Sequence, residues 1–487
     1  MEEKLAIEIT VLGLYIVLGT VVALLARRYG VRTSRDYYIA GGRLGTFLGA
    51  MTYAATTYSS FMIVGLVGIA YFTGIGSLGF ELAYYVSTLG ILAAISHRIY
   101  RKAREREWVT PSEMLGDIYG SRLFAAFVSL VYFFALLPYA SAQLKGIGET
   151  VAGLGGSPHY LTGIILGIIL VLVWTLLAGV WSVAVTDALQ GAWMITAALL
   201  LLGWVYWKLS TGLGVGLHDI THELESKGLL DVAPNKGFWK LPVFISFTLP
   251  WLFFALTNPQ VVQRLYMPRN EKSLKGMIVW FGVFGLVYTL VVVAVGLLAR
   301  AGEGFIIQGE LHGKDSVTPA LLNAAPLWLS VIVFVSIIAA SISTVDSIVL
   351  SVASSIGHDL LYSRNEQREL LATKAAIVLM VSIAGFIAYE RISYIVELSV
   401  LSSVLLLPLL PPTLVGILSE RPEKYNLESW TAVILGLTVA LFSAWHSGVS
   451  KVFTTNMLGL PVPAWVFSAS WLPFIVRGIA GLRRLRL

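Results

Sequence analysis

Long apolar stretches recur along the whole chain, and they constrain its fold more than any other feature. A helix needs about 20 apolar residues to cross the hydrocarbon core of a bilayer. Thirteen stretches reach roughly this length: 5–26, 45–71, 78–97, 123–149, 159–180, 183–207, 240–258, 275–299, 323–356, 372–389, 392–418, 427–446 and 461–478. Only helices and closed barrels satisfy every backbone polar group in lipid. The sequence therefore predicts an all-α polytopic membrane protein with about thirteen transmembrane helices.

The composition argues against most other classes of protein. Of the 487 residues, 57% are hydrophobic and 13% are charged, whereas a soluble domain carries roughly 25% charged residues. A soluble enzyme, a nucleic-acid binder and a disordered scaffold are therefore ruled out as first interpretations. The chain has no cysteine, so disulfides and thiolate chemistry are not expected. Scarce Asn and Gln together with absent Cys are typical of thermophile proteins. This composition is compatible with a thermophilic source organism but does not decide it.

The basic residues indicate how the chain crosses the membrane. On one set of alternate loops and the C-terminal tail lie 24 of the 34 lysines and arginines, and only nine lie on the other set. Basic loops stay in the cytoplasm, so we expect an outer N-terminus and a cytoplasmic C-terminus. Termini on opposite sides require an odd number of spans, and thirteen satisfies this requirement. The longest outer loop, 208–239, has room for a short surface helix but not for a domain, so residues 1–487 are interpreted as one membrane domain.

Five charged residues in the apolar stretches are the candidates for a charge at membrane depth: Glu81, Lys145, Asp187, Asp346 and Glu397. A charge at membrane depth costs at least about 2.5–3.5 kcal/mol on insertion, so these residues indicate function. The alternative is a side chain near a helix end that extends to the interface. This alternative is weaker for Asp187 and Asp346 because both have polar neighbours in the sequence.

A polar stripe in stretch 323–356 indicates a cation site. Ser343, Asp346 and Ser347 stand at i, i+3 and i+4, so they share one helix face. Thr344 is adjacent, and Ala340 lies one turn earlier. One carboxylate among neutral oxygens favours a monovalent cation over Ca²⁺, which needs 6–8 oxygen ligands. The alternative is small-residue helix packing, with the hydroxyls bonded back to their own helix.

Two stretches contain signals of a broken helix. Between 52 and 60, seven hydroxyl side chains crowd into nine residues, which weakens a helix. Five spans later Pro250 removes a helical hydrogen bond. Interrupted helices at matching places in two halves suggest an inverted repeat with a binding site between them. We therefore expect repeats at 45–207 and 240–418 with discontinuous helices 2 and 7, and peripheral helices at 5–26 and within 427–478.

Four motifs in the predicted order resemble the solute:sodium symporter family. They are the run Asp36–Arg43, the segment Ala184–Gln190 around Asp187, the pair Gln263-Arg264, and Ser343–Ser347 followed by Ser354, Ser355 and Asp359–Leu361. The likeness covers roughly residues 5–450. It implies the LeuT-like fold of two inverted five-helix repeats and a transporter, not an enzyme.

The resemblance also implies two ion sites. The main sodium site would use carbonyls of Ala55 and Tyr58 at the first break, and the carbonyl of Ala340 with the hydroxyls of Ser343 and Thr344. A second sodium or proton site would consist of Asp187, Ser343, Asp346 and Ser347. For Asp187 a role in proton coupling or in fixing a helix is the alternative. Na⁺ is the only metal expected, and no other cofactor is implied.

The solute pocket is expected beside the two breaks. Its candidate residues are Ser59, Ser60, Met62, Tyr139, Gln143, Lys145, Trp251 and Phe254, with Phe254 as the inner gate. Sugar-transporting members have Glu-Gln after the first break, where this chain has Phe61-Met62, and an Asn where it has Trp251. The departure favours a small carboxylate-bearing solute, such as proline, pantothenate or a monocarboxylate. Its carboxylate would bind a helix N-terminus or Lys145, for which an interfacial lysine is the alternative.

The resulting hypothesis is Na⁺-coupled uptake by alternating access across the plasma membrane of a prokaryote. The partners are the solute, Na⁺ and the bilayer, without nucleic acid, and we expect a monomer. A sugar or sialic acid symporter is the first alternative. A membrane-embedded sensor would need a cytoplasmic kinase domain, for which about ten residues after the last stretch leave no room. A channel and a membrane-embedded enzyme are disfavoured by the clustered, asymmetric polar stretches and the dispersed histidines.

Overall fold

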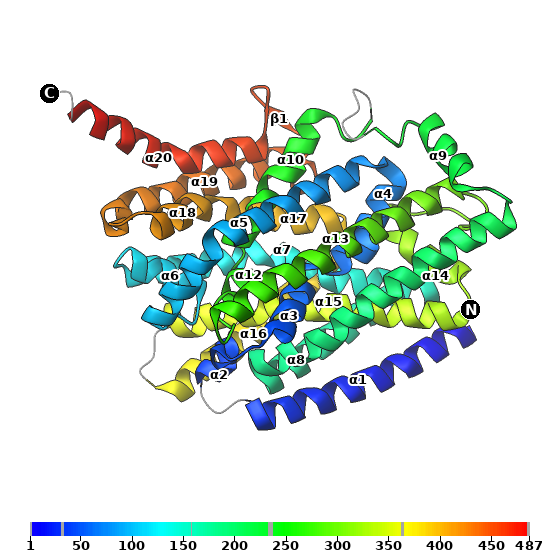
Figure 1. Cartoon of the computed structure of the whole chain (residues 1–487), viewed down its shortest axis with the longest axis horizontal. Helices are drawn as coiled ribbons and strands as arrows, with labels where there is room; N and C mark the ends of the chain where they lie inside the picture. The colour runs from blue at the N-terminus through cyan, green and yellow to red at the C-terminus, as the bar shows by residue number, and fades with distance from the viewer. Residues whose placement is uncertain (1, 31–33, 157, 232–236, 362–364, 485–487) are drawn as a thin grey trace.

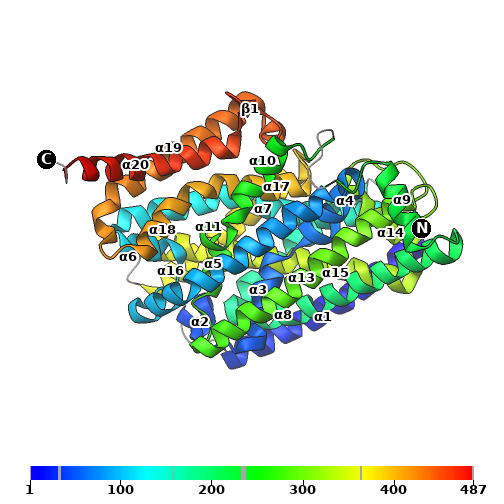
Figure 2. The ribbon, with the colours of Figure 1, turned by 45° about the horizontal axis from the view of Figure 1, so that its top comes forward.

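The computed structural model describes residues 2–30, 34–156, 158–231, 237–361 and 365–484. Long helices lie side by side in one bundle, and the strands of the described residues form only a short hairpin of β1 (Asn456–Met457) and β2 (Leu460–Pro461) (Figures 1 and 2). The all-α membrane architecture expected from the sequence is therefore confirmed.

The apolar stretches fall on helices. The long ones are α1 (Glu2–Gly30), α5 (Gly76–Arg106), α7 (Arg122–Gly155), α8 (His159–Gly212), α13 (Glu271–Ala301), α15 (Leu327–Ser355), α16 (Glu366–Tyr389), α19 (Asn426–Ser447) and α20 (Val462–Arg484). One further span joins α17 (Ile395–Leu406), η5 (Leu407–Leu409) and α18 (Leu410–Leu418). Short helices connect the spans: α2 (Ser34–Ile39), η1 (Ala40–Gly42), α6 (Pro111–Ile118), α9 (Leu217–Ser226), η3 (Lys314–Ser316), α14 (Val317–Ala324), η4 (Ile356–Leu360), η6 (Pro422–Tyr425) and η7 (Val449–Lys451).

Element α8 contains two spans separated by a reversal at Gly179. This glycine has φ 66° and ψ 176°, a conformation that L-residues with a side chain rarely adopt. A Cβ at this position would lie 2.5 Å from the Tyr37 ring. Backbone strain and lack of space therefore both require glycine here, between the spans predicted at 159–180 and 183–207.

The predicted second span is broken. It consists of α3 (Thr46–Thr57), η2 (Phe61–Leu66) and α4 (Val67–Thr73), with a bend of 50° between its halves. Tyr58 ends α3 in an extended conformation, with φ −97° and ψ 120°. The break predicted from the hydroxyl cluster is thus confirmed within the cluster itself.

The predicted seventh span is also broken, although not at the proline. It consists of α10 (Leu241–Leu252), α11 (Phe254–Thr257) and α12 (Pro259–Arg264). Pro250 lies inside α10, because the fixed φ of proline is compatible with a helix even though one hydrogen bond is lost. The helix ends at Phe253 (φ −106°, ψ 12°) and breaks again at Asn258 (φ −90°, ψ 114°).

The predicted count of thirteen spans is not confirmed. Among the described residues, 11 helices are long and apolar enough to cross a membrane, or 12 when the bent pair counts as one span. The difference arises at the seventh span, where α10 has 12 residues and is too short to cross by itself. Its two breaks divide the predicted stretch into pieces below the required length.

The first half of the broken second span, α3, lies among the long helices of the bundle. Element α3 packs against α8, α13 and α15, whereas α1 lies along one edge on α8 and α15 (Figure 1). Elements α19 and α20 pack against each other at the opposite edge (Figures 1 and 2). The assignment of these helices as peripheral to two repeats stays a prediction.

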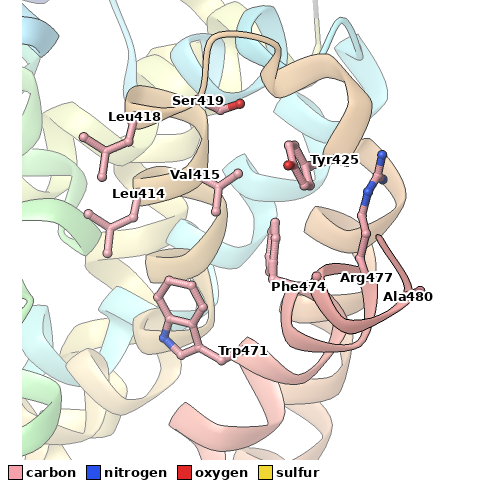
Figure 3. A pocket seen from close by; sticks show the side chains of 10 residues that line it. Leu414, Val415, Leu418, Ser419, Tyr425, Trp471, Phe474, Arg477 and Ala480 are labelled. Atoms are coloured by element: carbon pink, nitrogen blue, oxygen red, sulfur yellow. The ribbon is translucent and has the colours of Figure 1, made fainter. Parts of the chain in front are cut away.

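A groove of about 990 Å³ at the edge of the bundle is separate from the broken helices. It lies between α18 and α20, where Leu414, Leu418, Trp471 and Phe474 line it (Figure 3). Arg477 at its rim is paired with a carboxylate, at 2.7 Å from Glu428. No residue predicted to bind sodium or solute lines this groove.

Candidate sodium and solute site

The hydroxyls of α15 lie against the break of the second span. The Ala55 carbonyl accepts hydrogen bonds from Ser343 Oγ and Thr344 Oγ1, both at 3.0 Å. Ser343 Oγ also lies 3.1 Å from the Ala340 carbonyl. These carbonyl and hydroxyl oxygens, which the resemblance grouped across about 290 positions of sequence, form a cluster that we call the oxygen cage.

Tyr58, whose carbonyl was also predicted as a sodium ligand, lies at the break three positions after Ala55. Its N–H donates to the Ala54 carbonyl at 2.7 Å, and its extended conformation ends α3 there. Helix termination leaves carbonyls near the break without helical donors. Such carbonyls coordinate Na⁺ in discontinuous membrane helices. The residues of the cage are 0–1% exposed, so a cation held there would be shielded from water.

A second polar cluster lies next to the oxygen cage. Asp187 Oδ2 accepts a hydrogen bond from Thr52 at 2.6 Å, and Ser347 Oγ lies 2.9 Å from Thr56 Oγ1. Asp346 is 2% exposed, and its Oδ1 has no hydrogen-bond partner among the described residues. The proposed second-site residues Asp187, Asp346 and Ser347 are thus all buried in one region.

Arg264 also belongs to this second cluster, a role that the sequence did not indicate. Its Nη2 donates to Ser347 Oγ at 2.6 Å and lies 3.8 Å from Asp187 Oδ2. The side chain is buried at the end of α12. The sequence showed Arg264 only as part of a terminal motif, because its partners are separated from it by 77 and 83 positions.

Aromatic rings gather around Trp251, which lies just before the break of the seventh span. Ring centroids are 5.1 Å from Phe254, 5.2 Å from Phe61, 5.7 Å from Tyr84 and 6.3 Å from Tyr139. We call these five side chains the aromatic cluster. It connects α5, η2, α7 and the broken seventh span, and it brings together three predicted pocket residues: Tyr139, Trp251 and Phe254.

The other pocket residues lie at the start of η2 and on α7. Ser60 Oγ donates to Gln143 Oε1 at 2.8 Å. Ser59 Oγ accepts from the Phe61 N–H at 3.1 Å, and the Met62 N–H donates to the Ser59 carbonyl at 2.9 Å. Every predicted pocket residue on η2, α7 and the seventh span except Lys145 is at most 2% exposed. The structure therefore holds this region closed to solvent.

Lys145 is engaged by a carboxylate of the protein itself. Its Nζ lies 2.6 Å from Asp315 Oδ2 and donates to the Ser393 carbonyl at 2.8 Å. Asp315 also accepts from the Ile395 N–H at 3.2 Å. Lys145 thus connects α7 to η3 and to the start of α17, rather than pointing at the aromatic cluster as a free cation.

The remaining two charges predicted at membrane depth differ from each other. Glu397 on α17 is paired with Lys314 at 2.8 Å. Glu81 on α5 is 1% exposed, and no lysine or arginine of the described residues forms an ion pair with it. The Trp251 indole N–H interacts with the Glu81 carboxylate, although neither Trp251 Nε1 nor Glu81 Oε2 has a partner in good hydrogen-bond geometry. The alternative expected from the sequence, a side chain that extends to the membrane interface, therefore does not explain the position of Glu81.

The sequence of residues 37–425 matches the model of the sodium:solute symporter family. The chain belongs to this family. A sodium:solute symporter is a multi-pass membrane transporter and not an enzyme, so the resemblance and the transport class expected from the sequence are confirmed. The solute and Na⁺ are its partners.

Relatives extend along almost the whole chain. A sodium/pantothenate symporter of Haemophilus influenzae is 23% identical over 462 residues, which are 92% of this chain and 91% of that protein. A Na⁺-coupled sialic acid symporter, solved substrate-bound and outward-open with a novel Na⁺ site, matches with a TM-score of 0.75 at 16% identity over 96% of both chains.

A second solved structure shares the fold at greater distance. Mhp1, a nucleobase-cation-symport-1 family transporter in a closed conformation with bromovinylhydantoin bound, matches with a TM-score of 0.57 and 13% identity. It covers 93% of this chain and 95% of its own. At these identities the two solved structures show the fold alone, which agrees with the predicted LeuT-like architecture.

Proposed function

We propose that this symporter couples inward Na⁺ flow to the uptake of a small carboxylate-bearing solute by alternating access. The oxygen cage carries the proposal. It places two carbonyls and two hydroxyls from helices far apart in sequence within 3.0–3.1 Å hydrogen bonds of one another. Hard neutral oxygens at a broken helix suit a monovalent cation.

In this proposal Na⁺ binding orders the cage before the solute binds. The hydroxyls of Ser343 and Thr344 donate to the Ala55 carbonyl. Na⁺ would accept lone pairs from all of these oxygens together and so hold α3 against α15. Because Ser59 and Ser60 follow the break directly, the same ordering would shape the start of η2. The ion and the solute would thereby stabilise the same state, which is how binding couples two ligands.

The solute would bind between the start of η2 and the aromatic cluster. Backbone N–H groups at the N-terminus of a half-helix favour a carboxylate, and the rings supply an apolar surface. Closing of the rings around Trp251 and Phe254 would separate the solute from the cytoplasm. Phe61-Met62 in place of a Glu-Gln pair makes a sugar the weaker candidate.

The driving force sets how far such a solute can be concentrated. One charge crossing 100 mV contributes about 2.3 kcal/mol, and a tenfold Na⁺ gradient contributes about 1.4 kcal/mol. For one Na⁺ and a solute without net charge, the sum of about 3.7 kcal/mol supports roughly a few-hundredfold accumulation. A monoanion carried with one Na⁺ would gain only the chemical tenfold.

We further propose that the cluster of Asp187, Asp346, Ser343 and Ser347 takes one additional Na⁺ or proton. Two buried carboxyl groups, Asp187 and Asp346, interact there. Arg264 is the one basic side chain within 4 Å of Asp187 among the described residues, and no ion pair of Asp346 is found among them. A buried unpaired carboxylate is costly, so one further cation would balance the cluster. A sodium Hill coefficient near two that persists in Asp187→Asn would exclude Asp187 as a sodium ligand.

Uptake into proteoliposomes tests the proposed function. Vesicles containing the full chain would be given an inward Na⁺ gradient and a negative interior, with labelled proline, pantothenate and monocarboxylates as probes. We expect accumulation that requires Na⁺ and collapses with a sodium ionophore. Accumulation of the same size under a K⁺ gradient would refute sodium coupling.

A further inference from the structure

Glu81 lies inside the protein beside the aromatic cluster. It is the sixth residue of α5, is 1% exposed, and is followed one turn later by Tyr84 of the cluster. Its charge interacts with the hydroxyls of Tyr58, Tyr84 and Tyr139. The carboxylate therefore lies near Tyr84 and Trp251 of the aromatic cluster, beside the region where the solute is proposed to bind.

Within the part of the chain that the structure describes, no counter-charge faces this carboxylate. No described basic side chain pairs with Glu81, whereas Lys145, Arg264 and Lys314 each have a carboxylate of their own. Removing an ionised carboxylate from water without a partner costs several kcal/mol. The positive partner must therefore come from a ligand or a proton.

Neighbouring polar atoms are poorly satisfied. The Tyr84 hydroxyl has no hydrogen-bond partner among the described residues, and the Trp251 indole N–H and the Tyr58 hydroxyl have none in good hydrogen-bond geometry, although they lie near Glu81 and Thr289. Buried polar groups are normally satisfied, so this group of atoms indicates a ligand with polar substituents. The faces of the rings favour a positively charged group of the ligand, because a cation over Trp or Tyr is attracted by the ring quadrupole.

We propose that Glu81 and the aromatic cluster bind a cationic nitrogen of the solute, so that the transported class is a zwitterion of the amino-acid type. This rests on the proposed function, in which a solute occupies this region. The carboxylate of the zwitterion lies at the start of η2 and its ammonium at Glu81. The net charge of such a solute is zero, which is the case for which one Na⁺ gives the larger accumulation.

The test is a solute panel on purified full-length protein, read as the shift in melting temperature with and without Na⁺. The panel contains the twenty standard L-amino acids, pantothenate and, for each stabilising amino acid, the analogue in which hydrogen or carbon replaces the amino nitrogen; cyclopentanecarboxylate serves for proline. We expect at least one amino acid to stabilise in Na⁺ and its nitrogen-free analogue to fail. Stabilisation by pantothenate or a nitrogen-free carboxylate alone would overturn the inference.

Glu81→Gln keeps the shape of the side chain and removes its charge. A hydrogen bond to a charged group contributes enough that we expect solute affinity to fall about ten- to a hundredfold. Sodium-induced stabilisation without solute should not change. Glu105→Gln, at an exposed position on the same helix, is the matched control and should leave both responses intact.

The outcomes separate this inference from the proposed function. Unchanged solute affinity in Glu81→Gln would overturn the role of Glu81. A loss of the sodium response in the same variant would show that Glu81 holds the ion, which also overturns it. Failure of all twenty amino acids while Na⁺ still stabilises the protein would reject the zwitterion class and leave sodium binding standing. Absence of any sodium response in the unmodified protein would instead refute the proposed function.

Discussion

The ion pair between Lys145 and Asp315 should hold the predicted outer side of the transporter closed. It joins α7 to η3 at 2.6 Å, and both side chains are 5% exposed. Replacing Lys145 by Met leaves the Asp315 carboxylate buried without its cation. Removing one partner of a buried pair costs about 3–5 kcal/mol. The lower end applies because the Ile395 N–H still donates to Asp315.

If this cost falls on the closed state alone, the open population rises by the corresponding factor. About 3 kcal/mol corresponds to roughly a hundredfold. The absence of cysteine from the chain allows a single reporter thiol. Ser399→Cys introduces one at a position on α17 that is 0% exposed, and its labelling by a membrane-impermeant thiol reagent reports opening. We expect Lys145→Met to accelerate this labelling by one to two orders of magnitude, within the estimate above.

Two comparisons make the result decisive. Adding Asp315→Asn to Lys145→Met removes the unpaired charge, so the labelling rate should return most of the way to that of the reporter alone. Lys227→Met breaks an exposed pair with Glu223 and should change the rate little, because such pairs contribute about 0–1 kcal/mol. An unchanged labelling rate in Lys145→Met, or no recovery in the double variant, would refute the reasoning.

Two further substitutions test the packing around the sites. Gly285→Ala places a Cβ 2.2 Å from the Tyr58 hydroxyl, so displacement of Tyr58 should weaken sodium affinity. Gly90→Ala is the control, because no atom lies within 4 Å of its added Cβ. Sodium titrations that give the same affinity for both variants would contradict this prediction. Arg264→Gln leaves the buried Asp187 without its cation and should lower the free energy of unfolding by about 3–5 kcal/mol. Adding Asp187→Asn should restore part of this free energy, which denaturant titration in detergent would measure. If the two substitutions instead lower the free energy of unfolding additively, the ion pair between Arg264 and Asp187 is refuted.

The elements that the sequence predicted well are those with a local signal. The hydroxyl cluster between 52 and 60 predicted a broken helix because the competing side chains are adjacent in sequence. The Ser343 stripe was visible for the same reason. Pro250 signalled a break correctly but not its place, since the chain continues the helix to Leu252 and ends it at Phe253.

The contacts that the sequence could not show join distant segments. Lys145 appeared as a charge at membrane depth, yet its partner Asp315 lies 170 positions away. Arg264 appeared only in a terminal motif, although it lies between Asp187 and Ser347. Glu81 could not be distinguished from an interfacial side chain until its burial was known. No periodicity encodes which of several charged residues face one another.

Sodium titration of the oxygen cage tests the central claim most directly. The melting temperature of the purified protein would be followed as Na⁺ replaces K⁺ at constant ionic strength, for the unmodified chain and for Ser343→Ala with Thr344→Ala. Ser341→Ala removes a buried hydroxyl bonded to its own helix at Ile337 and is the control. We predict saturable stabilisation by Na⁺, preserved in the control and weakened at least about a hundredfold in the double variant. A double variant that responds to Na⁺ like the unmodified chain would contradict the account.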